Sequence, residues 1–530
     1  MTAGFPAAII ALRREKAALR RRKGARYMEL SDAKRMKAAD EAAIQGGIDS
    51  LVLMETAAQA LAEAAMDYLN GAGEAVIFCG PGNNGGDGVA AARILREKPG
   101  VSVRAFLVGA RERMSHDCRE MEQQLLDAGG TLEDFDPEAA GKSVLTAGVI
   151  IDAIFGVGLS RPVTGAALEA VELINTAKCP VVAADIASGV SADSGMILGA
   201  GVRAACTVTF SRAKPGHFIE PGCVLCGELR VADIGIPEEL LRESGCGVYA
   251  IHGEDLRLPA RGRLTHKGDH GKLLILGGSR PYTGAPTLCA KGALRAGAGL
   301  VYLGVSEDIY TIPAVKNDEA MVIPLPAGDD GTVSRRAWQE IEQRLGGCDT
   351  CVIGPGLGRS GDTAELTRLI LKNASIPVVA DADALWAISQ DMTILDNAQA
   401  EVVITPHAGE FARLLGRPVS DRLADALSFA REHNCAVVLK GHRTVCAFPD
   451  GQAYVVDAGN PGMAKGGSGD VLAGVIGALL GQMTSRRAVV TACWLHARAG
   501  DIAAGRFGEY AVTAGDIIDC LCRAEQEILE

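Results

Sequence analysis

The sequence has few aromatic residues and no long apolar run. Phe, Trp and Tyr together make up 4% of the 530 residues, whereas glycine alone occurs 65 times and hydrophobic residues reach 48%. This composition favours tightly packed α/β layers over β-sandwiches. The longest apolar run, Val471–Leu480, is interrupted by Gly474 and Gly477 and is too short to cross a bilayer, so it predicts a buried helix. We therefore expect a cytoplasmic protein with no membrane partner.

Positive charge is also scarce outside the first 26 residues. The formal net charge is −12, although residues 1–26 contain eight Lys and Arg residues and only one acidic residue, Glu15. The remainder is more acidic than the whole chain, which argues against nucleic acid as a partner. A phosphate ligand would have to be held by helix N-termini, glycine-rich loops and cations. We predict that residues 1–27 form a disordered basic arm; a true start at Met28 and a transit peptide are the alternatives.

The 15 cysteines form no metal-binding pattern. Two pairs have CxxC spacing, Cys223/Cys226 and Cys348/Cys351, but the pairs lie far apart in the sequence. A structural zinc site needs four ligands brought together. We expect reduced thiols that are mostly buried, as in a reducing compartment.

The length of the chain predicts two domains, because a single hydrophobic core rarely serves a chain of this size. Short apolar stretches alternate with helical segments before residue 236 and again after residue 270, which is typical of buried, mostly parallel sheets. Gly and Pro are frequent between these blocks. We predict two α/β domains, each with three αβα layers, in this arrangement: an N-terminal domain at 28–237, a linker at 238–248 and a C-terminal domain at 249–530.

A first glycine-rich segment, residues 80–88 (GPGNNGGDG), follows a predicted strand and opens a predicted helix. Two further predicted strands, Val149–Asp152 and Val181–Asp185, each end in Asp and are followed by glycine. Because the carboxyl ends of parallel strands meet at one crevice, these residues predict a binding site, although a tight turn or a helix cap would also explain each one alone. Oxygen ligands from Asn, Asp and Ser suit an alkali or alkaline-earth cation. The predicted strands continue to Val224–Val231.

Four motifs carry a family resemblance: LME at 53–55, PGNNGGDG at 81–88, IDAIFGVGLSRP at 151–162 and ADIASGV at 184–190. Together they resemble the NAD(P)H-hydrate epimerase domain, over about residues 28–237. The resemblance implies a Rossmann-like domain that interconverts the R and S forms of the C6 hydrate of NADH or NADPH.

The epimerase resemblance also implies roles for individual residues. Asp185 would be the acid/base residue, and potassium would be held by Asn84, Asp152 and Ser188. The residues implied to contact substrate are Asn83, Asn84, Gly85, Gly86, Asp87, Gly156, Val157, Gly158, Leu159, Ser160, Arg161, Pro162 and Asp185. Two positions depart from the family pattern, since Thr56 replaces an Asn and Ala187 replaces a Pro.

A second glycine-rich segment, residues 466–470 (GGSGD), precedes another predicted helix. The backbone N–H groups there would point at a phosphate and stabilise the charge that develops in phosphoryl transfer. Asp470 is placed to take a proton from an attacking hydroxyl, the alternative being a simple helix cap.

The C-terminal motifs resemble the ribokinase-like superfamily, and within it the NAD(P)H-hydrate dehydratases, over about residues 249–527. The motifs are HKGDHG (266–271), GGSRPYTGA (277–285), ALRAGAGLV (293–301), GPGLG (354–358), DADAL (381–385), TPHAGE (405–410), KG (440–441) and GNPGMAKGGSGDVLAG (459–474). The resemblance implies an enzyme that uses ADP, or ATP as in eukaryotic relatives, with Mg²⁺. It would phosphorylate the hydrate hydroxyl, and elimination would then regenerate NADH or NADPH with release of AMP and phosphate.

The dehydratase resemblance assigns Asp470 as the base that also contacts substrate. The other residues implied to meet the hydrate are Ala298, Gly356 and His407. The residues implied to meet the nucleotide are Lys440, Gly441, His442, Arg443, Thr444 and Gly469. Four residues depart from the usual pattern: Lys465 and Ser468 replace threonines, and His442 and Arg443 are less usual, which would affect nucleotide preference.

The two resemblances predict a bifunctional cofactor-repair enzyme. Its expected partners are small molecules only: NADHX, NADPHX and an adenine nucleotide. We expect K⁺ and Mg²⁺ as cofactors and a homo-oligomeric assembly. One alternative is a vitamin kinase of the hydroxymethylpyrimidine or thiazole type. The other is an epimerase-like domain that only binds a ligand or a protein.

Overall fold

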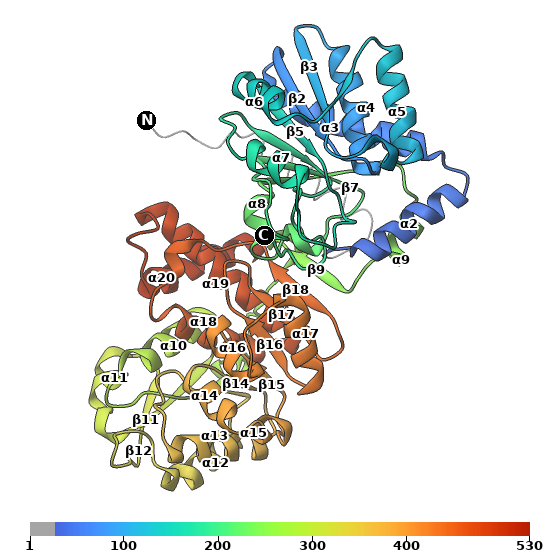
Figure 1. Ribbon diagram of the computed structural model, residues 1–530. Coiled ribbons are helices and arrows are strands. Elements are labelled where there is room, and N and C mark those ends of the chain that lie inside the picture. Colours follow the sequence, from blue (N-terminus) through green and yellow to red (C-terminus); the bar gives the residue numbers. More distant parts are fainter. Residues whose placement is uncertain (1–26, 530) are drawn as a thin grey trace. The chain divides into compact units, whose positions relative to one another are not determined.

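The computed structural model describes residues 27–529, and these form two compact units, one of residues 29–248 and one of residues 249–529 together with 27–28 (Figure 1). We call them the N-terminal unit and the C-terminal unit. Apart from Tyr27, the predicted basic arm at 1–27 lies outside the described residues. Within residues 27–529, the helices are too short or too polar to cross a membrane.

The N-terminal unit is built on a seven-stranded sheet in the order β4-β3-β2-β5-β6-β7-β8, in which every neighbouring pair is parallel. Its strands are β2 (Gly73–Cys79), β3 (Val101–Leu107), β4 (Leu132–Asp134), β5 (Val149–Ala153), β6 (Val181–Ala184), β7 (Cys206–Phe210) and β8 (Glu228–Ala232). Its helices are α2 (Ala33–Gln45), α3 (Ser50–Leu69), α4 (Asn83–Arg96), α5 (His116–Asp127), α6 (Pro137–Thr146), α7 (Ala166–Ile174), α8 (Gly222–Leu225) and α9 (Glu238–Glu243).

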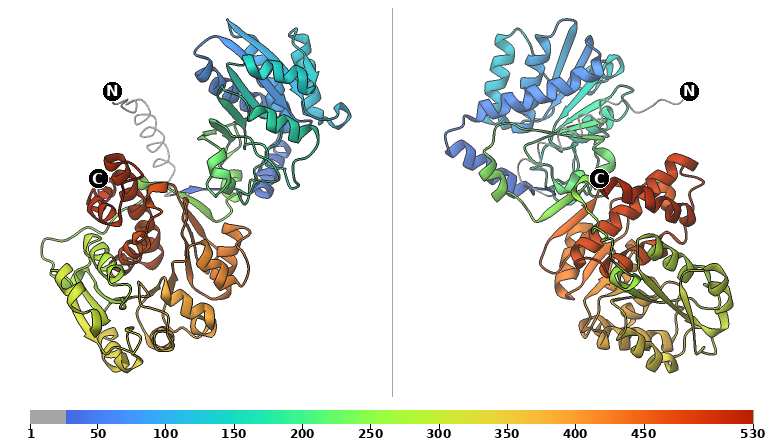
Figure 2. Two further views of the ribbon diagram at one scale, coloured as in Figure 1. Left: turned by 60° about the vertical axis from the view of Figure 1, so that its left-hand side comes forward. Right: turned by 180° about the vertical axis from the view of Figure 1, so that it is seen from behind.

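Helices cover both faces of this sheet because its strands are apolar on both sides (Figures 1 and 2). Ile77 and Ile151 pack with α2–α5, whereas their neighbours Val76, Phe78 and Ile150 pack with α6 and α7. Alternate residues of a strand point to opposite faces, so one run of apolar residues supplies two cores. The three-layer αβα class predicted for this unit is confirmed.

The C-terminal unit contains an eleven-stranded sheet in the order β1-β9-β18-β17-β16-β15-β14-β13-β10-β11-β12. Its strands are β1 (Met28–Glu29), β9 (Val248–Ile251), β10 (Lys272–Leu276), β11 (Leu300–Ser306), β12 (Met321–Leu325), β13 (Thr350–Ile353), β14 (Val378–Ala380), β15 (Val402–Ile404), β16 (Ala436–Leu439), β17 (Val445–Ala447) and β18 (Ala453–Val456). The block from β12 to β16 is parallel, and β17 and β18 continue it as antiparallel strands.

The helices of the C-terminal unit also form two layers. They are α10 (Gly284–Arg295), α11 (Thr311–Lys316), α12 (Trp338–Leu345), α13 (Gly361–Asn373), α14 (Asp383–Gln390), α15 (Thr393–Asp396), α16 (Ala408–Leu415), α17 (Arg422–Glu432), α18 (Ser468–Leu480), α19 (Ser485–Phe507) and α20 (Ala514–Leu529). Leu273 and Val352 share a core with α10 and α18–α20, while Leu274 and Cys351 are equally buried but belong to the opposite face. At the antiparallel end, α17 and α19 lie on opposite sides of the strands (Figure 2).

Each sheet changes the direction of its strand order once in its parallel part, between β2 and β5 and between β10 and β13. Loops that leave neighbouring strands in opposite directions at such a point open a crevice at the carboxyl ends of the strands. The glycine-rich segment 80–88 follows β2, and Gly277 follows β10. Both candidate sites therefore begin where this topology predicts ligand binding.

The local structure differs from the sequence-based expectation in three segments. The strand predicted at Val224–Val231 is wrong, because α8 ends at Leu225 and β8 begins only at Glu228, after Gly227 with a φ of 61°. The strand predicted at Val181–Asp185 ends at Ala184, and Asp185 adopts a left-handed φ of 64°. The predicted linker at 238–248 contains α9 and the first residue of β9.

Candidate active sites

The glycine-rich loop of the N-terminal unit is closed by backbone contacts that exclude side chains. A Cβ atom added to Gly85 would lie 1.6 Å from the carbonyl oxygen of Gly80, and one added to Gly80 would lie 2.0 Å from that of Ile154. Helix α4 begins at Asn83, and Gly82 before it offers no side-chain cap. The first N–H groups of α4 are therefore available to an anion.

The predicted substrate residues of this loop differ in their access to solvent. Asn83 is exposed and Asn84 is half-buried, whereas Gly85, Gly86 and Asp87 are buried. A Cβ on Gly86 would meet the side chain of Met54, so this glycine lets α4 pack on α3. In the loop after β5 the exposed residues are Gly158, Ser160, Arg161 and Pro162, and the half-buried ones are Gly156, Val157 and Leu159.

Asp152 and Ser188 form a buried pair at the ends of β5 and β6. The Ser188 hydroxyl donates to Asp152 Oδ1 at 2.6 Å, and the Ser188 N–H donates to Oδ2 at 2.8 Å. Burial raises the pKa of Asp152 to about 6, although the hydrogen bonds from Ser188 act to lower it. Asn84 lies against the same loop, since a Cβ on Gly156 would be 2.9 Å from its Oδ1.

The set Asn84, Asp152 and Ser188 fits a potassium ion in its chemistry. All three side chains offer oxygen atoms, the ligands that hard cations prefer. The Asn84 amide nitrogen is buried without a hydrogen-bond partner. This donor needs an acceptor such as a phosphate oxygen, whereas the amide oxygen of the same side chain is the atom that a cation would contact.

Asp185 is buried and paired with a buried lysine. Lys214 Nζ lies 2.5 Å from Asp185 Oδ1, and the Thr209 hydroxyl donates to the same oxygen at 3.0 Å. Burial alone would raise the pKa of Asp185, but the charge and hydrogen bond of Lys214 hold it below its usual range. Asp185 is therefore ionised at neutral pH and can accept a proton.

Two more carboxyl groups belong to this cluster. Burial raises the pKa of Asp40 to about 6 and that of Asp87 well above its usual range, and the charge of Asp185 adds to both effects. Burial thus favours the neutral form of Asp87, whereas Lys214 favours the ionised form of Asp185. Carboxyl groups with pKa values shifted in opposite directions are typical of acid/base sites.

Sequence reasoning missed Lys214, His217, Thr209 and Asp40. The first two follow β7, the next parallel strand after β6, so the rule that selected Asp152 and Asp185 also applies to them. The signal was the polar segment at 211–217 (SRAKPGH) after an apolar strand. Asp40 lies on α2, and nothing in its local sequence distinguishes it from a surface carboxylate.

The two departures from the epimerase pattern have simple structural settings. Thr56 is exposed on α3, and its hydroxyl donates to the Val52 carbonyl of the same helix at 2.8 Å. Ala187 is buried and accepts the Val190 N–H at 3.0 Å in the turn after β6.

In the C-terminal unit, Asp470 lies in the first turn of α18. The helix begins at Ser468, after Gly467 with a φ of 95°, and it has no side-chain cap. Burial raises the pKa of Asp470 to about 7; the neighbouring Asp381 adds to this effect and Lys440 opposes it. Asp470 thus combines the free N–H groups of a helix start with a carboxyl group that titrates near neutrality.

Lys440 connects Asp470 to two other carboxylates. Its Nζ lies 2.8 Å from Asp381 Oδ1 and 3.8 Å from Glu410 Oε2. A Cβ added to Gly469 would lie 3.3 Å from the same nitrogen. Burial alone would lower the pKa of Lys440, but Asp381 and Glu410 raise it above its usual value, so the ammonium stays charged.

His407 is the N-cap of α16 and lies beside Lys440. Its Nδ1 accepts the Gly409 N–H at 3.0 Å, and the backbone N–H of His407 donates to Glu410 Oε2 at 2.8 Å. Residues 407 and 440 form a parallel bridge that extends β15 and β16. The imidazole is 59% exposed, and its Nε2 lies 3.6 Å from Glu410 Oε1.

The predicted nucleotide segment follows Lys440 directly. A Cβ on Gly441 would meet the guanidinium of Arg422, and Arg443 forms an ion pair with Asp457. Thr444 bonds weakly to the Gly441 carbonyl, at 3.5 Å, and His442 lies between them in the chain. The predicted nucleotide residues 440–444 and Gly469 therefore lie close together, because Gly469 is next to the Lys440 side chain.

Two departures from the dehydratase pattern have clear contacts. Lys465 Nζ donates to the Tyr510 carbonyl at 2.6 Å, which attaches the loop before α18 to the loop before α20. The Ser468 hydroxyl lies 3.3 Å from Nε2 of the buried His496.

The structure does not bring Ala298 to this site. Ala298 precedes β11, so it lies at the amino end of the strands, and the neighbouring Ala296 carbonyl accepts from Gln482 just past the C-terminus of α18. Asp470 lies at the other end of that helix, about 18 Å away at 1.5 Å per residue. Sequence spacing could not show the position of Ala298. The motif ALRAGAGLV connects the end of α10 to the start of β11, at the edge of the sheet opposite to Asp470.

Ala285 occupies the position that was assigned to Ala298. Gly356 has a φ of 61°, and a Cβ on it would lie 3.1 Å from Ala285 Cβ and 2.7 Å from Tyr282 Cβ. Ala285 is in the first turn of α10, after β10, at the carboxyl edge that also carries Gly356 and Asp470. We therefore replace Ala298 by Ala285 in the candidate site.

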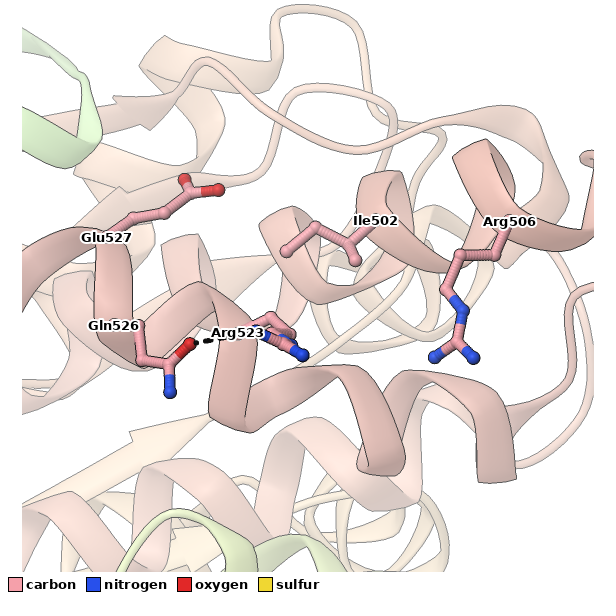
Figure 3. Close-up of a pocket in the computed structure, with 5 residues that line it drawn as sticks. All are labelled: Ile502, Arg506, Arg523, Gln526 and Glu527. Atoms are coloured by element: carbon pink, nitrogen blue, oxygen red, sulfur yellow. Dashed lines mark hydrogen bonds between the residues drawn. The ribbon is translucent and has the colours of Figure 1, made fainter.

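A separate cavity of ≈ 480 Å³ lies between α19 and α20 (Figure 3). Its walls are Ile502, Arg506, Arg523, Gln526 and Glu527. None of the predicted site residues lines it. In residues 27–529, His, Cys, Asp and Glu side chains form no group of three or more suited to a metal ion, so neither CxxC pair is part of such a group.

The comparisons with known proteins cover both units. A family model described as NAD(P)H-hydrate dehydratase matches residues 273–523, and one described as YjeF-related protein N-terminus matches residues 50–216. A bifunctional NAD(P)H-hydrate repair enzyme from Moorella thermoacetica is 41% identical, over 89% of this chain and 92% of that protein. The chain belongs to the bifunctional NAD(P)H-hydrate repair enzymes. This confirms the resemblance drawn from the motifs.

Other members are similarly close. The repair enzyme from Thermofilum pendens is 39% identical over 92% of this chain and 94% of that protein. Among solved structures, the chain is similar to an ADP/ATP-dependent NAD(P)H-hydrate dehydratase from Bacillus subtilis, with 30% identity and a TM-score of 0.44 over 51% of this chain and 95% of that one. Both candidate sites, around Asp185 and around Asp470, fall within the regions that the family models match.

Proposed function

We propose that this protein repairs hydrated nicotinamide cofactors in two steps. The N-terminal unit interconverts the R and S forms of the C6 hydrate of NADH or NADPH. The C-terminal unit dehydrates the S form with an adenine nucleotide, ADP yielding AMP and phosphate. Membership of the repair-enzyme family supports both activities. The observation that carries the dehydratase step is the Asp470 carboxyl group at the start of α18, beside Lys440.

In the dehydratase step, Asp470 takes the proton of the C6 hydroxyl while that oxygen attacks the terminal phosphoryl group. The unpaired N–H groups at the start of α18 stabilise the charge that develops on the phosphoryl oxygens. Phosphate then leaves C6 with the bonding electrons and a proton leaves C5, which restores the C5–C6 double bond. Lys440, 20% exposed and charged, offsets negative charge near the transferring group.

The carboxylates around Lys440 suit Mg²⁺ that arrives on the nucleotide. Mg²⁺ in nucleotide sites is held by one or two carboxylates together with phosphate oxygens and water. Asp381 and Glu410 are the carboxylates that would hold it. The ion would neutralise charge on the phosphates.

In the epimerase step, Asp185 exchanges the proton of the C6 hydroxyl, and the substrate lies along the loops after β2 and β5. Potassium on Asn84, Asp152 and Ser188 would supply positive charge beside the glycine-rich loop. That charge would complement the helix N-terminus in holding the diphosphate of the cofactor. The homo-oligomeric state and the cytoplasmic location stay predictions.

The test supplies both hydrate epimers with ADP or ATP, Mg²⁺ and K⁺, and follows the near-ultraviolet absorbance of the reduced nicotinamide. Wild type recovers both epimers. The D185N variant stops after the S form is consumed, and D470N recovers nothing while it still interconverts the epimers. Each variant is the control for the other, because a variant that loses one reaction and keeps the other is still folded and active. Absence of recovery by wild type with either nucleotide would refute the proposal, and a stable phosphorylated alcohol would indicate a vitamin kinase instead.

A further inference from the structure

One oxygen of the Asp185 carboxylate is held by the protein and the other is left for a ligand. Lys214 Nζ and the Thr209 hydroxyl both donate to Oδ1, at 2.5 and 3.0 Å. Lys214 Nζ also lies 2.8 Å from Thr209 Oγ1, so the three groups form a closed triangle. Of the donors in the described part of the chain, none bonds to Oδ2.

Lys214 is buried in a setting that is unusual for lysine. Its side chain is 1% exposed, and a lysine is almost never fully buried unless it is paired. The groups that face Asp185 and Lys214 come from four elements: Asp40 on α2, Asp87 on α4, Thr209 on β7 and His217 after β7. Lys214 is the cation within this group of carboxyls.

His217 ties the backbones of the two partners together. Its Nδ1 accepts the Lys214 N–H at 3.0 Å, so its Nε2 carries the proton and donates to the Asp185 carbonyl at 2.9 Å. Burial lowers the pKa of His217 to about 4, which keeps the ring neutral and this pair of bonds intact. The left-handed φ of Asp185, 64°, is uncommon for a residue other than glycine, and this contact helps to hold it.

We propose that Lys214 and His217 are positioning residues that make Asp185 a one-oxygen base, with Oδ1 held by Lys214 and Thr209 and Oδ2 facing the C6 hydroxyl. The inference rests on the epimerase function proposed above and deepens it. Oδ2 takes the hydroxyl proton as the C6–N1 bond breaks, C6 becomes a carbonyl and N1 receives the electron pair. Oδ2 gives the same proton to N1, and closure on the other face of C6 reverses these steps. No co-reactant is needed.

The central test replaces Lys214 by Met, which removes the charge and keeps much of the side-chain volume. Loss of the cation next to Asp185 raises the pKa of this carboxyl, so the acidic limb of the epimerase pH profile moves to higher pH. At pH 7 we expect kcat to fall by roughly 100-fold, the lower range for an impaired acid/base group, with KM changed less than about threefold. The matched control is K142M, which removes a lysine on α6 that is 72% exposed and forms an ion pair with Glu138.

Three further variants separate charge from geometry. K214R keeps the charge and should retain the acidic limb of wild type with a reduced kcat. T209V removes one of the two donors to Oδ1 without a change of charge and should lower kcat less than K214M does. H217N changes the link between the two backbones and should lower kcat without moving the acidic limb, because His217 is neutral in the native protein.

The outcomes decide the proposal in each case. Circular dichroism and thermal melting establish that each variant folds. If K214M folds and keeps the kcat and pH profile of wild type within twofold, the proposal is wrong. If K214M does not fold, the kinetics of K214R and T209V test the proposal instead. Wild-type kinetics in both of these variants would overturn the proposal. Wild type that does not interconvert the epimers refutes the proposed function itself, which is a different result from active variants.

Discussion

Lys440 donates a 2.8 Å hydrogen bond to Asp381, and this pair lies beside the helix start that carries Asp470. The Asp381 charge and burial act together to raise the pKa of Asp470, while Lys440 limits the rise. The carboxyl group is thereby brought to a pKa near neutrality, where it can gain and lose a proton during turnover. This arrangement leads to the first two predictions.

Replacing Asp470 by Asn should abolish dehydration while nucleotide binding is retained. We expect the turnover rate to fall by about 10³-fold or more, because the attacking hydroxyl loses its base. The nucleotide contacts that we propose come from residues 440–444 and from backbone N–H groups, which the substitution leaves in place. Rapid-quench kinetics would measure the rate, and calorimetric titration with ADP or ATP would measure binding. Cofactor recovery at the wild-type rate would contradict this role.

The pH dependence of the dehydratase should follow the raised pKa of Asp470. With a pKa of about 7, the carboxyl group is protonated below that pH, and the base is lost as pH falls. We expect kcat/KM to decrease tenfold for each pH unit below about 6 and to level off above about 8.

The same shift predicts a stability effect that does not depend on activity. A carboxyl group whose pKa is higher in the folded state favours folding while it is protonated, and this advantage is lost as pH rises through the folded-state pKa. The D470N variant cannot ionise, so its Tm should exceed that of wild type at pH 8, and the difference should shrink at pH 5. Differential scanning calorimetry of the nucleotide-free protein at both values would measure it. A difference that is equal at the two pH values would argue against the raised pKa.

The exchange of Ala298 for Ala285 in the site can be tested with two matched substitutions. A285V adds two methyl groups beside Gly356 at the carboxyl edge of the sheet and should raise KM for the hydrate about tenfold. A298V makes the same change at the opposite edge and should leave KM within twofold. Steady-state kinetics with the S epimer would compare them. The reverse result would restore Ala298 to the site.

Potassium binding at Asn84, Asp152 and Ser188 should be visible without substrate. An ion that binds only the folded state adds about 1.4 kcal/mol at ten times its Kd. For a unit of this size that raises Tm by about 3–6 °C. We expect K⁺ to produce such a shift in wild type and not in N84A, with Li⁺ at the same ionic strength as the control. Equal shifts with both ions, or in both proteins, would exclude a selective site.

The motifs of this chain predicted most of the chemistry that the structure brings together. Asp152 and Asp185 are each followed by a glycine four residues later, and Asp470 directly follows Gly469. This pattern at strand ends and helix starts can be recognised without coordinates. The failures have a common cause. Ala298 lies in a motif that ends at the amino side of β11. Lys214 follows β7, and the place of β7 beside β6 is known only from the strand order.

The fold class, the two glycine-rich helix starts and the family follow from the sequence alone, because they depend on local spacing and on residue types that few other structures tolerate. Which charges meet became visible only in the folded chain: Lys214 pairs with Asp185, Lys440 pairs with Asp381, and Asp185 lies close enough to Asp40 and Asp87 to raise the pKa of both. The physical reason is that the pKa of a group depends on burial and on charges within several ångströms, whichever part of the chain supplies them.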